Sequence, residues 1–138
     1  MINFNDYFKD GYQYTLKELS YKNIENSTET HSFNLTITDT IKTNISNQWL
    51  NIVYGRQLMF KPEVLYTMNV EFEIHIPFKD EIDPNTIKVN WEKELIDTEN
   101  SYISNIASRI SLLISTITSS YGQQPIITPP LPMFENND

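Results

Sequence analysis

The stretch from Val64 to Phe78 alternates apolar and polar side chains, and this pattern constrains the fold of the chain more than any other. Its apolar positions are Val64, Tyr66, Met68, Val70, Phe72, Ile74, Ile76 and Phe78. A period of two residues predicts a β-strand with one buried face. At about 3.3 Å per residue the strand would extend roughly 50 Å, which is long enough to organise an antiparallel sheet. Another part of the chain must then cover the apolar face of that sheet.

Two further stretches predict strands of the same sheet. Residues 33–38 alternate apolar and polar side chains. Residues 12–16 begin a similar alternation, but its parity has changed by Leu19 and Tyr21, which indicates a bulge or a bend.

The remaining sheet-forming residues are less regular. Residues 49–60 are rich in apolar side chains, but Gly55 and Arg56 interrupt the alternation. Pro62 marks a turn into the long strand. We interpret residues 84–95 as a crossover from the sheet to a helix.

An amphipathic helix of roughly five turns is predicted after residue 102. Its apolar residues recur three and four positions apart, and its opposite face is small and uncharged, which suits close contact with another helix. The apolar residues are Ile103, Ile106, Ala107, Ile110, Leu113, Ile114 and Ile117. The opposite residues are Ser104, Ser108, Ser111, Ser115, Thr118 and Ser119. Gly122 supplies a stop signal for this helix.

A proline-rich, apolar segment follows the helix; we call residues 125–134 the strap. Proline removes amide donors and keeps the backbone extended, so these residues cannot form a central strand. Two alternatives stay open: the strap covers the core, or it lines an open groove. The prolines are Pro125, Pro129, Pro130 and Pro132, and the apolar residues are Ile126, Ile127, Leu131, Met133 and Phe134.

The order of these C-terminal features resembles the SecB export chaperones. The resemblance rests on Asn105–Ile106, serines and threonines through Thr118, then Gly122, Pro125, a proline near residue 130, and Phe134. Residues 17–22 are similar to the first strand of that family. The resemblance implies an α+β fold: a four-stranded antiparallel sheet with a crossover and a long C-terminal helix followed by the proline-rich strap.

The resemblance also implies a function. It predicts an ATP-independent holdase that binds unfolded polypeptides in hydrophobic grooves, in the service of protein export, and that assembles as a dimer of dimers, a homotetramer with helices between subunits. The two acidic positions with which the family docks the SecA motor read Glu18 and Lys22 here, so one charge is inverted. The alternative is a SecB-like adaptor, or an antitoxin-associated chaperone, with a dedicated partner other than SecA.

Candidate contact residues follow from these patterns. We expect an oligomer interface at Ser104, Ser108, Ser111 and Ser115. The candidate peptide-binding residues are Trp49, Tyr54, Trp91, Pro129, Pro130, Leu131, Met133 and Phe134. Aromatic side chains also dominate ordinary cores, so core packing is the alternative role of the two tryptophans and Tyr54.

Length and composition limit the remaining functions. With 138 residues the chain is expected to form one domain, 1–138. A net charge of −8 disfavours nucleic acid or an anionic membrane as a partner. The absence of cysteine excludes disulfides and sulfur-ligated zinc, and together with a start that lacks a signal-peptide pattern it leads us to expect a cytoplasmic protein. Titratable residues do not cluster in the sequence, so we expect neither an enzyme nor a bound cofactor. Glu71, Glu73 and His75 share a strand face, but we interpret them as a solvated surface and predict no metal site.

Overall fold

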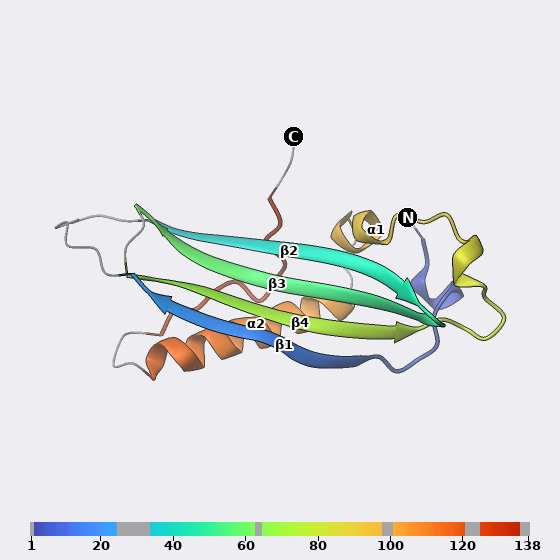
Figure 1. Cartoon of the computed structure of the whole chain (residues 1–138), viewed down its shortest axis with the longest axis horizontal. Coiled ribbons are helices and arrows are strands. Elements are labelled where there is room, and N and C mark those ends of the chain that lie inside the picture. Colours follow the sequence, from blue (N-terminus) through green and yellow to red (C-terminus); the bar gives the residue numbers. More distant parts are fainter. Residues whose placement is uncertain (1, 25–33, 63–64, 98–100, 121–124, 136–138) are drawn as a thin grey trace.

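The computed structural model describes residues 2–24, 34–62, 65–97, 101–120 and 125–135. Four long strands form one sheet, with one long helix across a single face of it (Figure 1). In chain order the elements are η1 (Phe4–Asp6), β1 (Gln13–Asn23), β2 (Asn34–Ser46), β3 (Trp49–Lys61), β4 (Tyr66–Pro77), η2 (Pro84–Thr86), α1 (Trp91–Asp97) and α2 (Ser101–Ser119). The predicted α+β fold, with a four-stranded antiparallel sheet and a long C-terminal helix, is confirmed.

The strands lie in the order β1-β4-β3-β2, and every neighbouring pair is antiparallel. β2 and β3 form a hairpin in which Ser46 pairs with Trp49. Asn47 turns the chain there with a φ of 56°, a conformation that asparagine tolerates better than most residues. The register of β1 on β4 shifts between Leu16 and Glu18, which confirms the predicted bulge.

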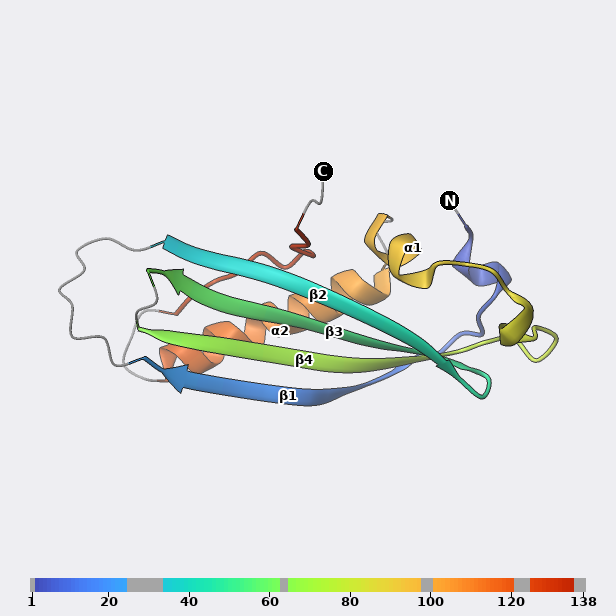
Figure 2. The ribbon, with the colours of Figure 1, turned by 45° about the horizontal axis from the view of Figure 1, so that its top comes forward.

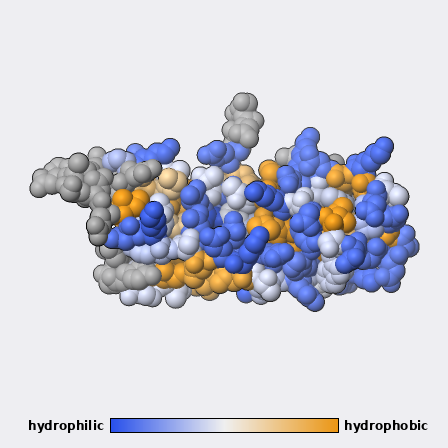
Figure 3. Space-filling view, viewed as in Figure 1, coloured by the Kyte–Doolittle hydropathy of each residue, from blue (hydrophilic) through white to orange (hydrophobic). Residues whose placement is uncertain are grey.

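The sheet is covered on one face only. In β4 the apolar residues from Tyr66 to Ile76 are buried at every second position, as the alternation predicts. The apolar stripe of α2 packs against them, and its fully buried members are Ile103, Ile106, Ala107, Ile110 and Ile114. We refer to the covered side as the inner face of the sheet and to the opposite side as its outer face. The outer face is largely hydrophilic (Figure 3).

The N-terminal turn η1 and α1 pack at the end of the sheet where β2 turns into β3. Trp91, the first residue of α1, is 4% exposed and packs within 6.0 Å, between ring centroids, of Phe4, Tyr7, Phe8 and Phe78. Residues 84–95 thus carry the chain from the sheet to the helical layer, as the crossover interpretation expects. No helix of the described residues is long and apolar enough to cross a membrane.

Candidate functional site

The strap lies on the inner face of the sheet, beside α2 and on the side of β2 (Figure 2). Two hydroxyl groups of α2 fix its first half. Ser111 Oγ donates to the carbonyl of Thr128 at 2.6 Å, and the amide of Ile126 donates to Thr118 Oγ1 at 2.8 Å. Phe134 forms an isolated parallel bridge with Asp39 of β2. The strap therefore runs from the helix to an edge strand of the sheet.

A buried ion pair lies beneath the strap. Asp39 of β2 and Arg56 of β3 are register partners, and both occupy inner-face positions that are otherwise mainly apolar. Arg56 Nε donates to Asp39 Oδ1 at 2.7 Å and Nη2 donates to Oδ2 at 2.9 Å, which makes the pair bidentate. Both side chains have 0% exposure. Such burial is tolerated only where the remaining donors and acceptors are also satisfied.

The strap satisfies the remaining donors of Arg56. Nη1 donates to the Thr128 hydroxyl at 2.8 Å and to the Pro129 carbonyl at 2.6 Å. Nη2 donates to the Leu131 carbonyl at 2.7 Å. Burial disfavours the charged form of Arg56, but the hydrogen bonds and charge of Asp39 outweigh that effect and raise the pKa of the guanidinium. Arg56 is therefore a permanent cation that connects the strap to the sheet.

Asp39 completes the connection. Its Oδ2 accepts the amide of Met133 at 2.7 Å and the hydroxyl of Tyr54, and its own amide donates to the Met133 carbonyl at 2.9 Å. The Tyr54 pKa is raised far above its ordinary value, first by burial and then by the adjacent Asp39 carboxylate. Tyr54 thus remains a neutral donor. Its ring also contacts Phe134 edge-on, with 5.8 Å between centroids.

Strap side chains that point away from this network remain in solvent. Ile127 is 79% exposed, Leu131 is 59% exposed and Met133 is 37% exposed. Phe134 is only half-buried, beside Tyr54. Part of the strap therefore covers the core, and another part presents apolar side chains to solvent on a fixed backbone. That these side chains line a groove stays a prediction.

A second exposed apolar surface lies on the other side of α2. The inner-face residues of β1 extend past the helix and remain 36–47% exposed; we call them the β1 strip: Tyr14, Leu16, Leu19 and Tyr21. The guanidinium of Arg109 lies 4.6 Å from the centroid of the Tyr14 ring, which places this side of α2 against β1. Leu112, one turn further along the helix, is 69% exposed. Figure 3 shows a hydrophobic patch along the rim where β1 and α2 lie.

The structure separates the three candidate groove aromatics. Tyr54 lies under the strap with no exposed surface, and Trp91 is buried in the aromatic cluster at the end of the sheet. Trp49 is partly exposed on the outer face, at the β2–β3 turn, where it lines an open hollow of about 180 Å³ with His75 and Asn51. Only Tyr54 therefore lies with the strap residues, and it contacts them from below.

The small-residue face of α2 is divided between the strap and solvent. Ser111 is buried under Thr128, whereas Ser108 is exposed. Ser104 and Ser115 are partly buried. Of the four candidate interface serines, Ser108 is the one that is exposed to solvent.

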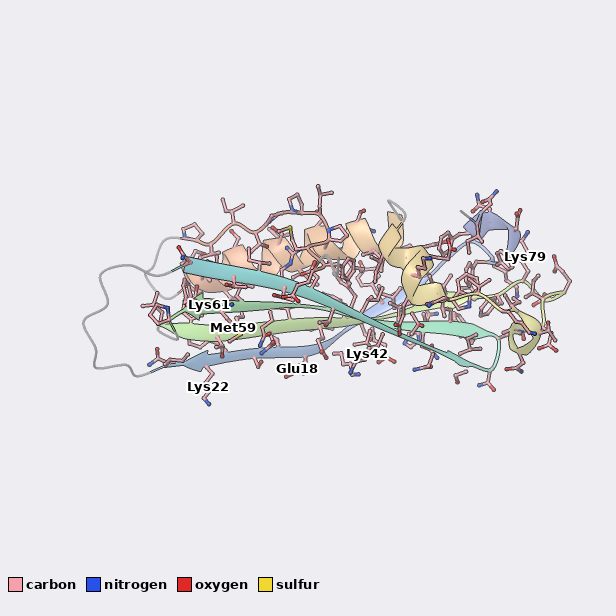
Figure 4. The ribbon with its side chains drawn as sticks, turned by 90° about the horizontal axis from the view of Figure 1, so that it is seen from above. Glu18, Lys22, Lys42, Met59, Lys61 and Lys79 are labelled. Atoms are coloured by element: carbon pink, nitrogen blue, oxygen red, sulfur yellow. The ribbon has the colours of Figure 1, made fainter. Side chains whose placement is uncertain are left out.

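Glu18 and Lys22 extend from β1 on the outer face, away from α2 (Figure 4). Both side chains are exposed, and Lys42, Met59 and Lys61 lie on the same face of the sheet.

Glu71, Glu73 and His75 share one face of β4, as the alternation of this strand predicts. These residues alternate along the outer face of β4, and the described residues contain no group of three or more candidate ligands that could hold a metal ion.

Sequence reasoning missed the Asp39–Arg56 pair, although a signal was present. Asp39 interrupts an apolar row that continues at Ile41, and Arg56 interrupts the row from Ile52 to Phe60. The two positions lie symmetrically about the Asn47–Gln48 turn, so a hairpin centred there places them opposite each other. Opposite charges at matching positions of two otherwise apolar rows predict a buried pair.

Comparisons with known proteins identify the fold. No protein-family model matches the chain, and no curated protein matches it. Among solved structures it is similar to the SecB-like chaperone Rv1957 of Mycobacterium tuberculosis, in complex with a ChAD peptide from the antitoxin HigA1 (Rv1956). The two share 8% identity and a TM-score of 0.61 over 85% of this chain and 86% of that one. A protein of unknown function from Streptococcus agalactiae aligns with 12% identity and a TM-score of 0.39, over 85% of this chain and 93% of that one.

The chain has a SecB-like fold. At 8% identity the likeness to the mycobacterial chaperone Rv1957 concerns the fold alone.

Proposed function

We propose that the chain is an ATP-independent chaperone that holds non-native polypeptides. The observation that carries the proposal is the strap, which presents Ile127, Leu131 and Met133 to solvent on a backbone anchored to the core. The SecB-like fold supports it, since a chaperone with this fold was solved in complex with a peptide.

The chemistry of the strap suits an unfolded client. Apolar contact is non-directional, so separated aliphatic side chains can accept many sequences. The backbone is already fixed by Arg56 and Asp39, so binding a client costs little strap entropy. We assign client contact to Pro129, Pro130, Leu131, Met133 and Phe134 of the strap, with Ile127 added. Trp49 would contact a client only if the client extended to the outer face of the sheet. Tyr54 and Trp91 support the fold.

We further propose that the chain assembles as a homo-oligomer, a dimer of dimers, in which the β1 strip is covered by a second copy. In the described part of the sheet, β1 pairs with β4 on one side and with no strand on the other. The opposite edge strand, β2, is less accessible, because the amide of Thr43 donates to Glu92 at 3.1 Å and that of Asp39 donates to the strap. An unpaired edge beside four exposed apolar residues favours association at β1. Ser108 and its neighbours on α2 are assigned to contact between the two dimers.

The partner that receives clients is proposed from the charges on the outer face. Glu18 retains one acidic docking position, and Lys22 inverts the other. An inverted charge at an exposed contact changes which partner binds more than it changes the fold. We therefore favour a dedicated protein partner over SecA. The antitoxin peptide bound to the mycobacterial neighbour is a precedent for a dedicated polypeptide partner. Newly made, unfolded chains occur in the cytoplasm, so we propose that the protein acts as a chaperone in that compartment.

Light scattering tests the proposed function. The chain should suppress aggregation of several unrelated, chemically unfolded proteins in the absence of nucleotide. Serum albumin at equal mass is the control for non-specific crowding. Suppression for one client alone would favour the dedicated chaperone or adaptor, and suppression for none would overturn the holdase proposal.

A further inference from the structure

The contacts between the strap and the sheet follow the period of an extended chain. The carbonyls of Pro129 and Leu131 accept from Arg56, and the carbonyl of Met133 accepts from the amide of Asp39. These acceptors are every second residue, so they leave the strap in one direction. The ion pair thus contacts the backbone of the strap rather than its apolar side chains.

The prolines restrict this contact to one register. Asp39 Oδ2 accepts an amide hydrogen from Met133 at 2.7 Å. A slip of one residue would bring Pro132 to this acceptor, and proline has no amide hydrogen. A slip in the other direction would bring Phe134 there and move its ring away from Tyr54, a contact of 5.8 Å between centroids. Either slip would also withdraw the Thr128 hydroxyl from Arg56.

We infer that Asp39 and Arg56 are positioning residues for client binding: they fix the register of the strap and thereby select Leu131 and Met133 as the side chains offered to a polypeptide. The inference rests on the proposed function. Neither side chain touches solvent, so neither side chain contacts a client. Their effect on affinity is transmitted through the strap backbone, which connects the two buried charges to the exposed Leu131.

Stability alone gives no reason for this pair. Replacing a buried ion pair by apolar residues of similar volume is often neutral or stabilising, whereas removal of one partner is strongly destabilising. The test variant therefore replaces the network as a whole: Asp39→Leu, Tyr54→Phe and Arg56→Met. It keeps the inner face filled, leaves no buried charge, and removes every side-chain bond by which the sheet fixes residues 128–133.

Two readouts test the inference: amide hydrogen exchange at Met133, and the affinity for a labelled, unfolded peptide. We expect exchange to accelerate by at least about tenfold and affinity to fall by at least about fivefold, since the strap loses the side-chain bonds that hold it to the sheet while the core remains. Ile52→Val, a conservative change at a buried position of the same strand, is the matched control and should leave both readouts unchanged. Arg56→Lys is the second variant, to be used if the triple variant does not fold. Lysine keeps the charge but lacks the planar fork that reaches three strap acceptors, so it should show the same two effects at smaller size.

The outcomes separate the inference from the proposed function. Unchanged exchange at Met133 in the folded variant would overturn the positioning role. Faster exchange with unchanged peptide affinity would overturn the selection of client contacts and leave the holdase proposal standing. If the unaltered chain binds no unfolded peptide, the proposed function fails, and the inference about client binding fails with it.

Discussion

At the scale of single residues, the strap divides its side chains between two tasks that the sequence could not separate. Leu131 and Phe134 are both large and apolar; Leu131 follows Pro130 directly, and Phe134 lies two residues after Pro132. Their surroundings differ because Leu131 extends into solvent while Phe134 rests on the ring of Tyr54. Exposure depends on the buried charges beneath the strap, which are distant in the sequence.

This division predicts opposite effects for two alanine substitutions. Leu131→Ala should leave the melting temperature unchanged and weaken client binding by roughly tenfold, since burial of such a side chain against a client contributes about 1.5–3 kcal/mol. Phe134→Ala should lower the melting temperature with a smaller effect on affinity. Thermal unfolding and fluorescence titration with one unfolded peptide measure the two effects. If Leu131→Ala binds the peptide as tightly as the unaltered chain does, the assignment of Leu131 to client contact is contradicted.

Tyr54 predicts a dependence of stability on alkaline pH. Its pKa is about 10 in an unfolded chain and higher in the folded chain, so between these values only the unfolded state releases the proton. The free energy of unfolding should therefore fall as the pH rises above about 10, by up to about 1.4 kcal/mol per pH unit for this residue. Urea unfolding of the unaltered chain and of Tyr54→Phe, at about pH 8 and about pH 10.5, measures the difference. The loss should be smaller in Tyr54→Phe, although burial also raises the pKa of Tyr66 and Tyr102. Equal losses in the two proteins would show that Tyr54 is not held neutral.

At the scale of elements, α2 shows how much of a helix's environment the periodicity of its sequence can predict. The three-four spacing predicted its apolar face correctly, and Ile103, Ile106 and Ile110 are all fully buried. The opposite face was harder to interpret, because small hydroxyl residues are compatible with either a helix contact or a strap. Ser111 and Thr118 bind the strap of the same chain. Local patterns predicted the strands and the helix, whereas the position of the strap depends on Asp39 and Arg56 meeting across the hairpin.

The serines of α2 give a prediction about assembly. Ser108→Glu places a charge on an exposed position and should shift the oligomer towards smaller species if α2 lies between dimers. Ser46→Glu is the matched control and should leave the mass unchanged, because Ser46 is an exposed serine at the β2–β3 turn, on the outer face and away from α2. Multi-angle light scattering of both variants reports the mass. An unchanged mass for Ser108→Glu would remove this helix face from the interface.

At the scale of the whole molecule, the chain presents two apolar surfaces on either side of α2. The β1 strip lies beside an unpaired strand edge, which suits a second copy. The strap has few amide donors and cannot pair as a strand, which suits side-chain contact with changing clients. The sequence predicted the α+β architecture and pointed to the strap. It did not predict the β1 strip, because the alternation of an edge strand does not show whether the helix covers the inner face of that strand.

The central claim is that the chain distinguishes unfolded from folded polypeptides. The most direct measurement is fluorescence anisotropy of one labelled protein, presented once in its native form and once reduced and carboxymethylated so that it stays unfolded. The account predicts saturable, nucleotide-independent binding of the unfolded form, no binding of the native form, and weaker binding by Leu131→Ala. Equal binding of the two forms, or binding of the native form alone, would contradict the account.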